Sequence, residues 1–194
     1  MAAPKSTTIE LPPLNIQTVN FILVGDSALI VHAWSEKAKR QMLDKQMKKA
    51  SKAKEAKDPE ADYQACFYKT ETGGYGFPAI GIKSAMVGAC RFVDMKMTEA
   101  RGAFHIDAEM VPVFGDPRPR EDMVRVGMGT ADIRYRPEFP DWRIPLAVKF
   151  NASVISAEQI ANLLNTAGFA IGIGEWRPEK NGSFGRFHVA GEGE

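Results

Sequence analysis

The sequence predicts one domain of the α+β class, for three reasons. The chain has 194 residues, of which 44% are hydrophobic and 25% are charged, as in a globular protein with a single core. No run approaches the roughly 18 consecutive apolar residues that a membrane-spanning helix needs. Strand-like and helix-like segments follow one another in the order strand, helix, strands, helix, strand, which is typical of a split β-α-β, or ferredoxin-like, core. We therefore expect residues 1–194 to form a single ferredoxin-like domain.

Two strands are expected before the first helix. Residues 19–25 and 27–34 are nearly continuous runs of apolar and β-branched residues, and a Gly-Asp pair separates them. Runs of this kind indicate strands that are buried in a sheet.

A basic helix is expected to follow, inserted within residues 35–62. Between Ser35 and Glu60 there are nine Lys or Arg and five Asp or Glu, a net charge of +4, which leaves 16 basic and 19 acidic residues, or −3, elsewhere. Ser35 is a suitable N-cap, Pro59 would end the helix, and the sparse apolar residues predict a helix on the surface or projecting from it. Its lysines form either a solvated face or an arm that contacts phosphates, and composition does not choose between these.

Two further helices are expected on the sheet. One covers residues 79–92, after the glycine-rich, proline-containing segment 73–78, and it is dense in small and apolar residues, as close packing on a sheet requires. The other covers residues 156–168, with Ser156 as its N-cap and Gly168 near its end. The buried stripe of this helix would consist of Ile160, Leu163, Leu164 and Ala167.

Three strands are expected between these helices, over residues 103–114, 123–135 and 143–154, where polar and apolar residues alternate. This region contains Arg134 and Arg136 among aromatic residues. Such a combination suits single-stranded nucleic acid, because bases stack on rings while guanidinium groups contact phosphates. The alternative is that both arginines lie on the solvent face of an antiparallel strand. The aromatic residues are Tyr135, Phe139 and Trp142.

The closing segment, residues 172–189, combines a glycine-rich loop with an aromatic and basic strand. Glycine has no side chain to block a close approach, so such a loop can bring backbone N–H groups against a phosphate. Its glycine spacing matches neither a dinucleotide-binding fold nor a P-loop.

The sequence also excludes several kinds of site. Cys66 and Cys90 form no CxxC pair and have too few histidine neighbours, so we expect both to be reduced and structural, with no metal site. The three histidines lie in apolar or strand-like runs, and no HExxH, GxSxG or paired-carboxylate motif occurs, so no catalytic residue and no cofactor are expected. The N-terminus lacks the apolar run of a secretory signal, and we expect a cytoplasmic protein with no membrane partner. The histidines are His32, His105 and His188.

Two segments together resemble the RAMP superfamily, the ferredoxin-like proteins that include backbone subunits of CRISPR effector complexes. Residues 77–91 are similar to the family's first-helix signature, an apolar-proline turn followed by small residues, an apolar residue, a lysine and a later basic residue. Residues 172–189 are similar to its glycine-rich loop, which follows the second helix and ends in a Gly-Arg-apolar strand. The expected helix over residues 157–168 lies where the family has its second helix.

The resemblance implies a non-catalytic protein that binds single-stranded RNA or DNA. Such proteins assemble head to tail along one strand, so it also implies a homo-oligomeric filament, either with other effector subunits as partners or as a stand-alone phage relative. Residues 35–62 would then be an insertion, and residues 102–142 a protruding hairpin like the family's thumb. Two alternatives remain open: a phage structural or scaffold subunit that polymerises without nucleic acid, and a metal-independent RNA endonuclease that uses His188.

The expected nucleic-acid contacts come from the basic helix, the first-helix signature, the arginine-bearing strand and the glycine loop. They are Lys45, Lys48, Lys49, Lys52, Lys83, Arg134, Arg136, Trp176, Arg177, Lys180 and Arg186.

Overall fold

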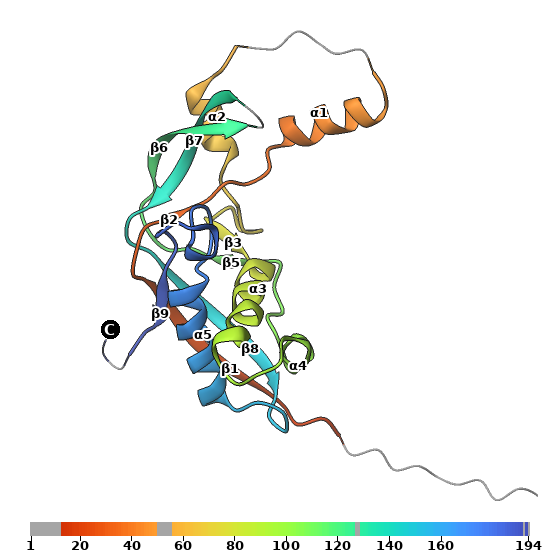
Figure 1. The fold of residues 1–194 in the computed structure, drawn as a ribbon, viewed down its shortest axis with the longest axis vertical. Helices are drawn as coiled ribbons and strands as arrows, with labels where there is room; N and C mark the ends of the chain where they lie inside the picture. The colour runs from red at the N-terminus through yellow and green to blue at the C-terminus, as the bar shows by residue number, and fades with distance from the viewer. Residues whose placement is uncertain (1–12, 50–55, 127–128, 192, 194) are drawn as a thin grey trace, which may run out of the picture.

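A four-stranded antiparallel sheet forms the centre of the computed structural model, which describes residues 13–49, 56–126, 129–191 and 193. Its strand order is β4-β8-β1-β9, and two helices, α3 and α5, pack together on one face (Figure 1). The chain order β1-α3-β4-β8-α5-β9, with β8 between β1 and β4, is the ferredoxin-like arrangement, and the α+β prediction is confirmed. The elements are β1 (Ile16–Gly25), α3 (Ala79–Ala89), β4 (Phe104–His105), β8 (Arg143–Asn151), α5 (Ala157–Ala170) and β9 (Phe187–Val189).

The two faces of this sheet differ in burial. Side chains alternate along β8, so that Leu146 and Phe150 are buried under the helices while Ala147 and Lys149 are exposed on the opposite face. β1 pairs with the whole length of β8, and the ring of its Phe21 packs against the same buried core. The open face therefore presents no aromatic side chain from its two central strands, β1 and β8.

Helix α5 agrees closely with its prediction. Ser156 is the N-cap, and its hydroxyl accepts a hydrogen bond from the Gln159 amide while the Gln159 side chain accepts one from the Ser156 amide. Gly168 lies in the last turn of the helix, near its end as expected, and a Cβ there would stand 1.8 Å from the carbonyl oxygen of Phe187 in β9. This glycine is needed for the close approach of α5 to β9.

The basic helix is shorter than predicted. Helix α1 (Glu36–Gln46) begins at the Ser35 N-cap as expected, but it ends at Gln46, well before Pro59. Lys48 has a left-handed backbone with φ 53°. Pro59 begins a second helix, α2 (Pro59–Ala65), whose N-cap is Asp58, because proline suits the first turn of a helix as well as it ends one. No residue of α1 is buried, as its thin apolar stripe predicted.

The segment between α3 and β8 is also organised differently from its prediction. The expected strand over residues 123–135 is a hairpin of two strands, β6 (Arg118–Val126) and β7 (Thr130–Phe139), which form a second sheet with β2 (Leu29–Ile30). The expected strand over residues 103–114 is divided among several short elements. These are the end of α4 (Met97–Ala103), β4, and β5 (Met110–Pro112), which pairs with β3 (Gly76–Pro78).

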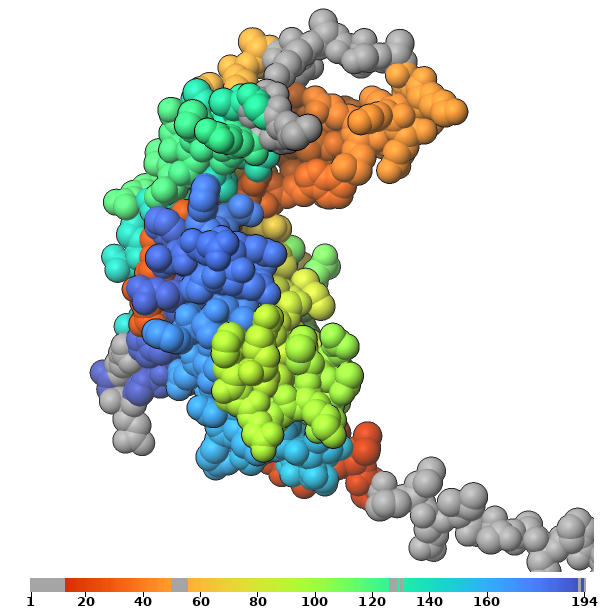
Figure 2. Space-filling model, in the orientation of Figure 1, coloured from red at the N-terminus to blue at the C-terminus, as the bar shows by residue number. Residues whose placement is uncertain are grey.

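The whole molecule has the shape of a crescent. The ferredoxin-like core and α4 form one end, and the β6–β7 hairpin with α1 and α2 forms the other (Figure 1). Figure 2 shows that α1 overhangs the concave side of the crescent. In the described part of the chain, no helix combines the length and apolar character needed to cross a membrane.

Candidate nucleic-acid interface

Two cavities meet in the middle of the crescent. The first, here called the glycine-loop cavity, has a volume of about 370 Å³ and lies between the start of α3 and the loop that follows α5. The second, the hairpin cavity, has a volume of about 440 Å³ and lies between α1, α2 and β7. His32 lines both cavities, so they are neighbours.

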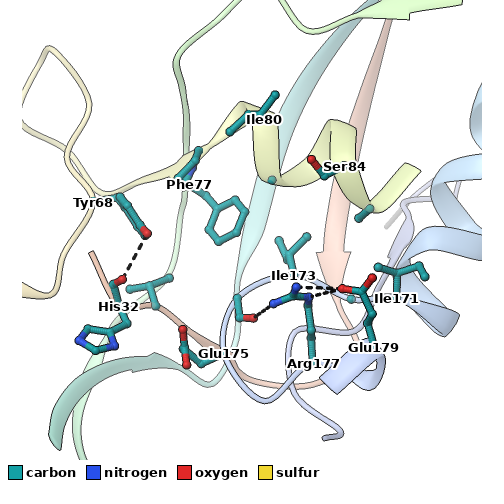
Figure 3. A pocket seen from close by; sticks show the side chains of 16 residues that line it. His32, Tyr68, Phe77, Ile80, Ser84, Ile171, Ile173, Glu175, Arg177 and Glu179 are labelled. Carbon is teal, nitrogen blue, oxygen red and sulfur yellow. Dashed lines mark hydrogen bonds and ion pairs between the residues drawn. The ribbon is translucent and has the colours of Figure 1, made fainter. Parts of the chain in front are cut away.

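The glycine-loop cavity brings together the two segments on which the RAMP resemblance depends. Ile80 and Ser84 of α3 line one side of it, and Ile173 and Arg177 of the loop line the other (Figure 3). The side chain of Ile80 is 70% exposed and offers an apolar surface at the rim. The sequence thus identified two segments that the fold places across one cavity.

Backbone hydrogen bonds hold the glycine loop to the rest of the protein. The amide of Ile173 donates to the carbonyl of Gly185, that of Glu175 to Ile30, and that of Gly185 to Ala28. Gly185 has φ 64°, and a Cβ there would stand 1.8 Å from the Ile173 carbonyl oxygen. These amides are engaged within the fold, so the expectation that they meet a phosphate is wrong for them.

Trp176 extends from this loop in an unusual conformation. Its φ of 55° lies in the left-handed region, which costs a bulky residue on the order of 1–3 kcal/mol. Its carbonyl oxygen accepts a hydrogen bond from the Phe184 amide, and a Cβ on Gly182 would stand 1.7 Å from the same oxygen. The indole nevertheless remains 44% exposed. The loop therefore supports a strained backbone that leaves an aromatic ring accessible.

The guanidinium of Arg136 lies 5.9 Å from the Trp176 ring centroid, and the cations of the loop itself differ in how they are held. Arg177 donates to the carbonyl of Gly174 at 3.1 Å and to the carboxylate of Glu179 at 2.8 Å, so its guanidinium is fixed and paired (Figure 3). Lys180 is exposed in the short η2 turn (Pro178–Lys180), and Arg186 is half-exposed, with its Nε 3.3 Å from the Ser183 carbonyl oxygen. Lys180 and Arg186 are thus the more accessible cations of this loop.

An ion-pair network connects the glycine loop to the hairpin. Arg136 of β7 is at its centre: it donates to Asp122 of β6 at 2.8 Å and to Glu175 of the loop at 3.1 Å. Arg120 bonds both Asp122 and Glu138, and its guanidinium lies 4.9 Å from the Phe184 ring centroid. The six groups of the network balance in charge. They are Arg118, Arg120, Arg136, Asp122, Glu138 and Glu175.

The prediction that Arg136 contacts nucleic acid is contradicted by this network. Only 1% of the residue is exposed, and its two terminal nitrogens are paired with acidic side chains. Its Nε has no hydrogen-bond partner among the described residues. The alternative that Arg136 lies on a solvent face is wrong too, because the glycine loop covers it. Its role in the structure is to join the hairpin to the loop.

Arg134 lies on the same strand but is accessible. It lines the hairpin cavity, its side chain is 37% exposed, and its Nε stands 4.0 Å from Asp132, at the outer limit of an ion pair. Trp34, the last residue of the strand expected over residues 27–34, lines the same cavity and is 54% exposed, yet it is not among the contacts predicted from the sequence. Phe139 and Trp142, expected beside the arginines on the surface, are 1% and 3% exposed and belong to the core.

Of the predicted contacts that the structure describes, only Arg177 and Arg134 line a cavity, and the predicted lysines at the end of α1 and in α3 lie away from both cavities. Lys83 donates to the carbonyl of Arg101 at 3.0 Å and stands 3.2 Å from His105 Nδ1, so α4 and β4 hold it. Lys45 and Lys48 are exposed at the end of α1, where Lys49 pairs with Asp44 at 2.9 Å. Lys52 lies outside the described residues.

His32 separates the cavities with an uncharged side chain at neutral pH. Burial lowers the pKa of His32, the carboxylate of Glu175 opposes this, and the guanidinium groups of Arg134 and Arg136 lower it further. Its backbone carbonyl accepts a hydrogen bond from the Tyr68 hydroxyl (Figure 3). A neutral imidazole leaves positive charge in this region to the arginines and lysines.

Replacing His32 with Gln is expected to reduce the loss of stability in acid. Because the pKa of His32 is lowered on folding, the unfolded chain binds the proton more tightly, and the wild-type free energy of unfolding falls as the pH drops below about 6.5. Urea denaturation at pH 7.5 and at pH 5.5 measures the effect, with His105→Gln as the control. The prediction would be contradicted if the free energy of unfolding fell by the same amount between pH 7.5 and pH 5.5 in wild type and in His32→Gln.

The other candidate chemical groups lie outside the cavities or are inert. His188 Nδ1 stands 2.7 Å from the Asp26 carboxylate on a partly exposed surface, and it lines neither cavity. Cys66 and Cys90 are buried and unpaired, and burial raises the pKa of the Cys66 thiol to about 11. Within the described ranges, no cluster of three His, Cys, Asp or Glu residues could hold a metal ion.

Comparison with known proteins is informative at the level of structure. No protein-family model matches the sequence, and no curated protein is significantly similar to it. The fold is similar to the crystal structure of Cmr6 from Pyrococcus furiosus, with a TM-score of 0.50 and 11% sequence identity, over 92% of this chain and 100% of the Cmr6 chain. At this identity the likeness is evidence of the fold alone, and that fold is RAMP-like.

Proposed function

We propose that this protein binds single-stranded nucleic acid without cleaving it. The observation that carries the proposal is the exposed, left-handed Trp176, whose neighbours Glu175 and Arg177 line the cavity between the start of α3 and the glycine loop. A strained backbone at an exposed aromatic residue is typical of a functional site, because stability alone would favour glycine there. An exposed indole offers a stacking surface to any base.

The charges around Trp176 are compatible with a polyanion. The acidic residues of the glycine loop are already neutralised, since Glu175 pairs with Arg136 and Glu179 with Arg177. Lys180 and Arg186 on the loop and Arg134 at the hairpin remain available to contact phosphates. A strand can therefore lie across the loop without meeting unpaired carboxylates from it.

Replacing Trp176 with Ala is expected to weaken binding of single-stranded oligonucleotides by about 5- to 150-fold, the loss of 1–3 kcal/mol that one stacked base contributes. Fluorescence anisotropy with a labelled 20-mer measures the loss. The control is Phe169→Ala, since Phe169 is 74% exposed at the end of α5 and lines neither cavity. Equal affinities for wild type and Trp176→Ala would contradict the assigned role.

The proposal also requires that affinity depend on salt. If four cations contact phosphates, a plot of the logarithm of the association constant against the logarithm of the salt concentration should have a slope of about −3. Absence of binding at low salt would end the proposal.

We also propose that the protein assembles head to tail along the bound strand, as a subunit of a CRISPR-type ribonucleoprotein or as a phage relative. The RAMP-like fold and the surface of α1 support this proposal. Leu43 of α1 and Met47, the C-cap of this helix, are more than half exposed, as expected of a helix that contacts another subunit. Electron microscopy of the purified protein tests it, and isolated monomers with bound nucleic acid would count against it.

Two alternatives depend on specific features. The exposed apolar side chains of α1 would equally serve a scaffold subunit that polymerises without nucleic acid, and an absorbance ratio at 260 and 280 nm typical of pure protein would favour it.

The contact between His188 and Asp26 would orient an imidazole for general-base catalysis in an RNA endonuclease. Cleavage of RNA by wild type but not by His188→Ala would favour that activity.

A further inference from the structure

Trp34 is a large exposed aromatic residue that the fold does not explain. It follows β2, precedes the N-cap of α1 and lines the hairpin cavity with 54% of its surface exposed. Across the described residues its ring makes no aromatic or cation–π contact, and its indole N–H donates no hydrogen bond. The ring is therefore accessible to a ligand in the cavity.

The cavity also contains a basic group with unused hydrogen-bonding capacity. Arg134 makes only the 4.0 Å contact to Asp132 through its Nε, so that Nη1 and Nη2 donate to no group in the described part of the chain. Asp132 itself pairs with Lys57 at 2.6 Å, which weakens its hold on Arg134. A guanidinium with two free nitrogens is well suited to a phosphate.

The hairpin cavity also contains an acidic side chain. Asp62 of α2 lines the same cavity and is half-buried. Its carboxylate forms no hydrogen bond or ion pair with any described residue. A carboxylate repels phosphate but accepts hydrogen bonds from the amino group of a base, as Asp and Glu do with cytosine. The ring, the guanidinium and the carboxylate therefore match the face of a base, a phosphate and the amino group of a base.

We propose that the hairpin cavity binds one unstacked nucleobase that carries an exocyclic amino group. The base stacks on Trp34, its amino group donates to Asp62, and Arg134 holds the adjacent phosphate. A volume of about 440 Å³ lies within the usual range for small-ligand pockets. The inference rests on the proposed function and adds a second base site, next to the glycine-loop cavity across His32.

The site is tested with labelled 20-mers of cytidylate and uridylate, as RNA and as DNA. Trp34→Ala should weaken binding of the cytidylate strand by about 5- to 150-fold, and Trp34→Phe, which keeps a stacking ring, should restore most of the affinity. Circular dichroism checks that each variant is folded. Wild-type affinity in folded Trp34→Ala would overturn the inference.

Base selectivity provides a second, independent readout. Wild type should bind cytidylate more tightly than uridylate, and Asp62→Asn should reduce that preference, whereas Glu60→Gln on the exposed side of α2 should keep it. Equal affinity of wild type for the two strands would overturn the role of Asp62. If Trp176→Ala weakens binding and Trp34→Ala does not, the proposed function stands and the second site is wrong. If wild type binds no strand at low salt, both fail.

Discussion

Replacing Arg136 with Gln is expected to lower the free energy of unfolding by about 3 kcal/mol. The guanidinium is 1% exposed and holds Asp122 of the hairpin and Glu175 of the glycine loop. Its loss leaves Asp122, whose side chain is only 10% exposed, with Arg120 as its remaining cationic partner. It also removes the link between two parts of the molecule that contact each other through few other charges. Urea denaturation followed by circular dichroism measures the change.

Arg118→Gln is the matched control for this prediction. Arg118 belongs to the same network and pairs with Glu138 at 2.8 Å, but its side chain is 64% exposed. Glu138 is buried but keeps its ion pair with Arg120 at 3.1 Å, and a cation as exposed as Arg118 contributes little, so this variant should lose less stability than Arg136→Gln. If Arg136→Gln lowered the free energy of unfolding by no more than Arg118→Gln does, the buried ion pairs would not hold the hairpin in place.

Replacing Gly168 with Ala is expected to destabilise the protein by about 3 kcal/mol, at the upper end of overpacking effects. An added Cβ would stand 1.8 Å from the Phe187 carbonyl oxygen and 2.6 Å from its carbonyl carbon. Both atoms belong to the backbone of β9, so relief requires α5 to move away from the sheet. The same denaturation experiment measures the loss.

Gly102→Ala should have the opposite effect. Gly102 lies in α4, a Cβ there meets no atom within 4 Å, and alanine favours the helix by roughly 0.5–1 kcal/mol over glycine. Stabilisation at Gly102 with destabilisation at Gly168 separates packing from helix propensity. If Gly168→Ala were as stable as wild type, the close contact between α5 and β9 would be refuted.

The fold class could be predicted from the sequence because its determinants are local. The Ser156 cap and the buried stripe of α5 lie within one helix, and the alternation of β8 lies within one strand. Local signals were ambiguous where one residue serves two purposes. Pro59 both prevents a helix from continuing and begins α2, and the alternation over residues 123–135 continues across the turn of the hairpin.

Only part of the candidate site could be predicted from the sequence. Accessibility depends on groups that the chain brings from elsewhere, and periodicity does not show them. Arg134 and Arg136 are two residues apart on β7 and so share one face of the strand, yet the glycine loop covers Arg136 and leaves Arg134 exposed. Trp34 stands beside a helix cap in sequence and becomes part of a site only when α2 and β7 form the other walls of its cavity.

Photo-crosslinking of a bound single strand tests the central claim most directly. A 20-mer containing photoreactive bases is irradiated on the wild-type protein, and the crosslinked peptides are identified by mass spectrometry. We expect crosslinks at Trp176, whose neighbours Glu175 and Arg177 line the glycine-loop cavity, and in the first turn of α3 on the other side of that cavity. Crosslinks confined to the open face of the sheet, at residues such as Ala147 and Lys149, would contradict the assignment of this cavity as the binding site.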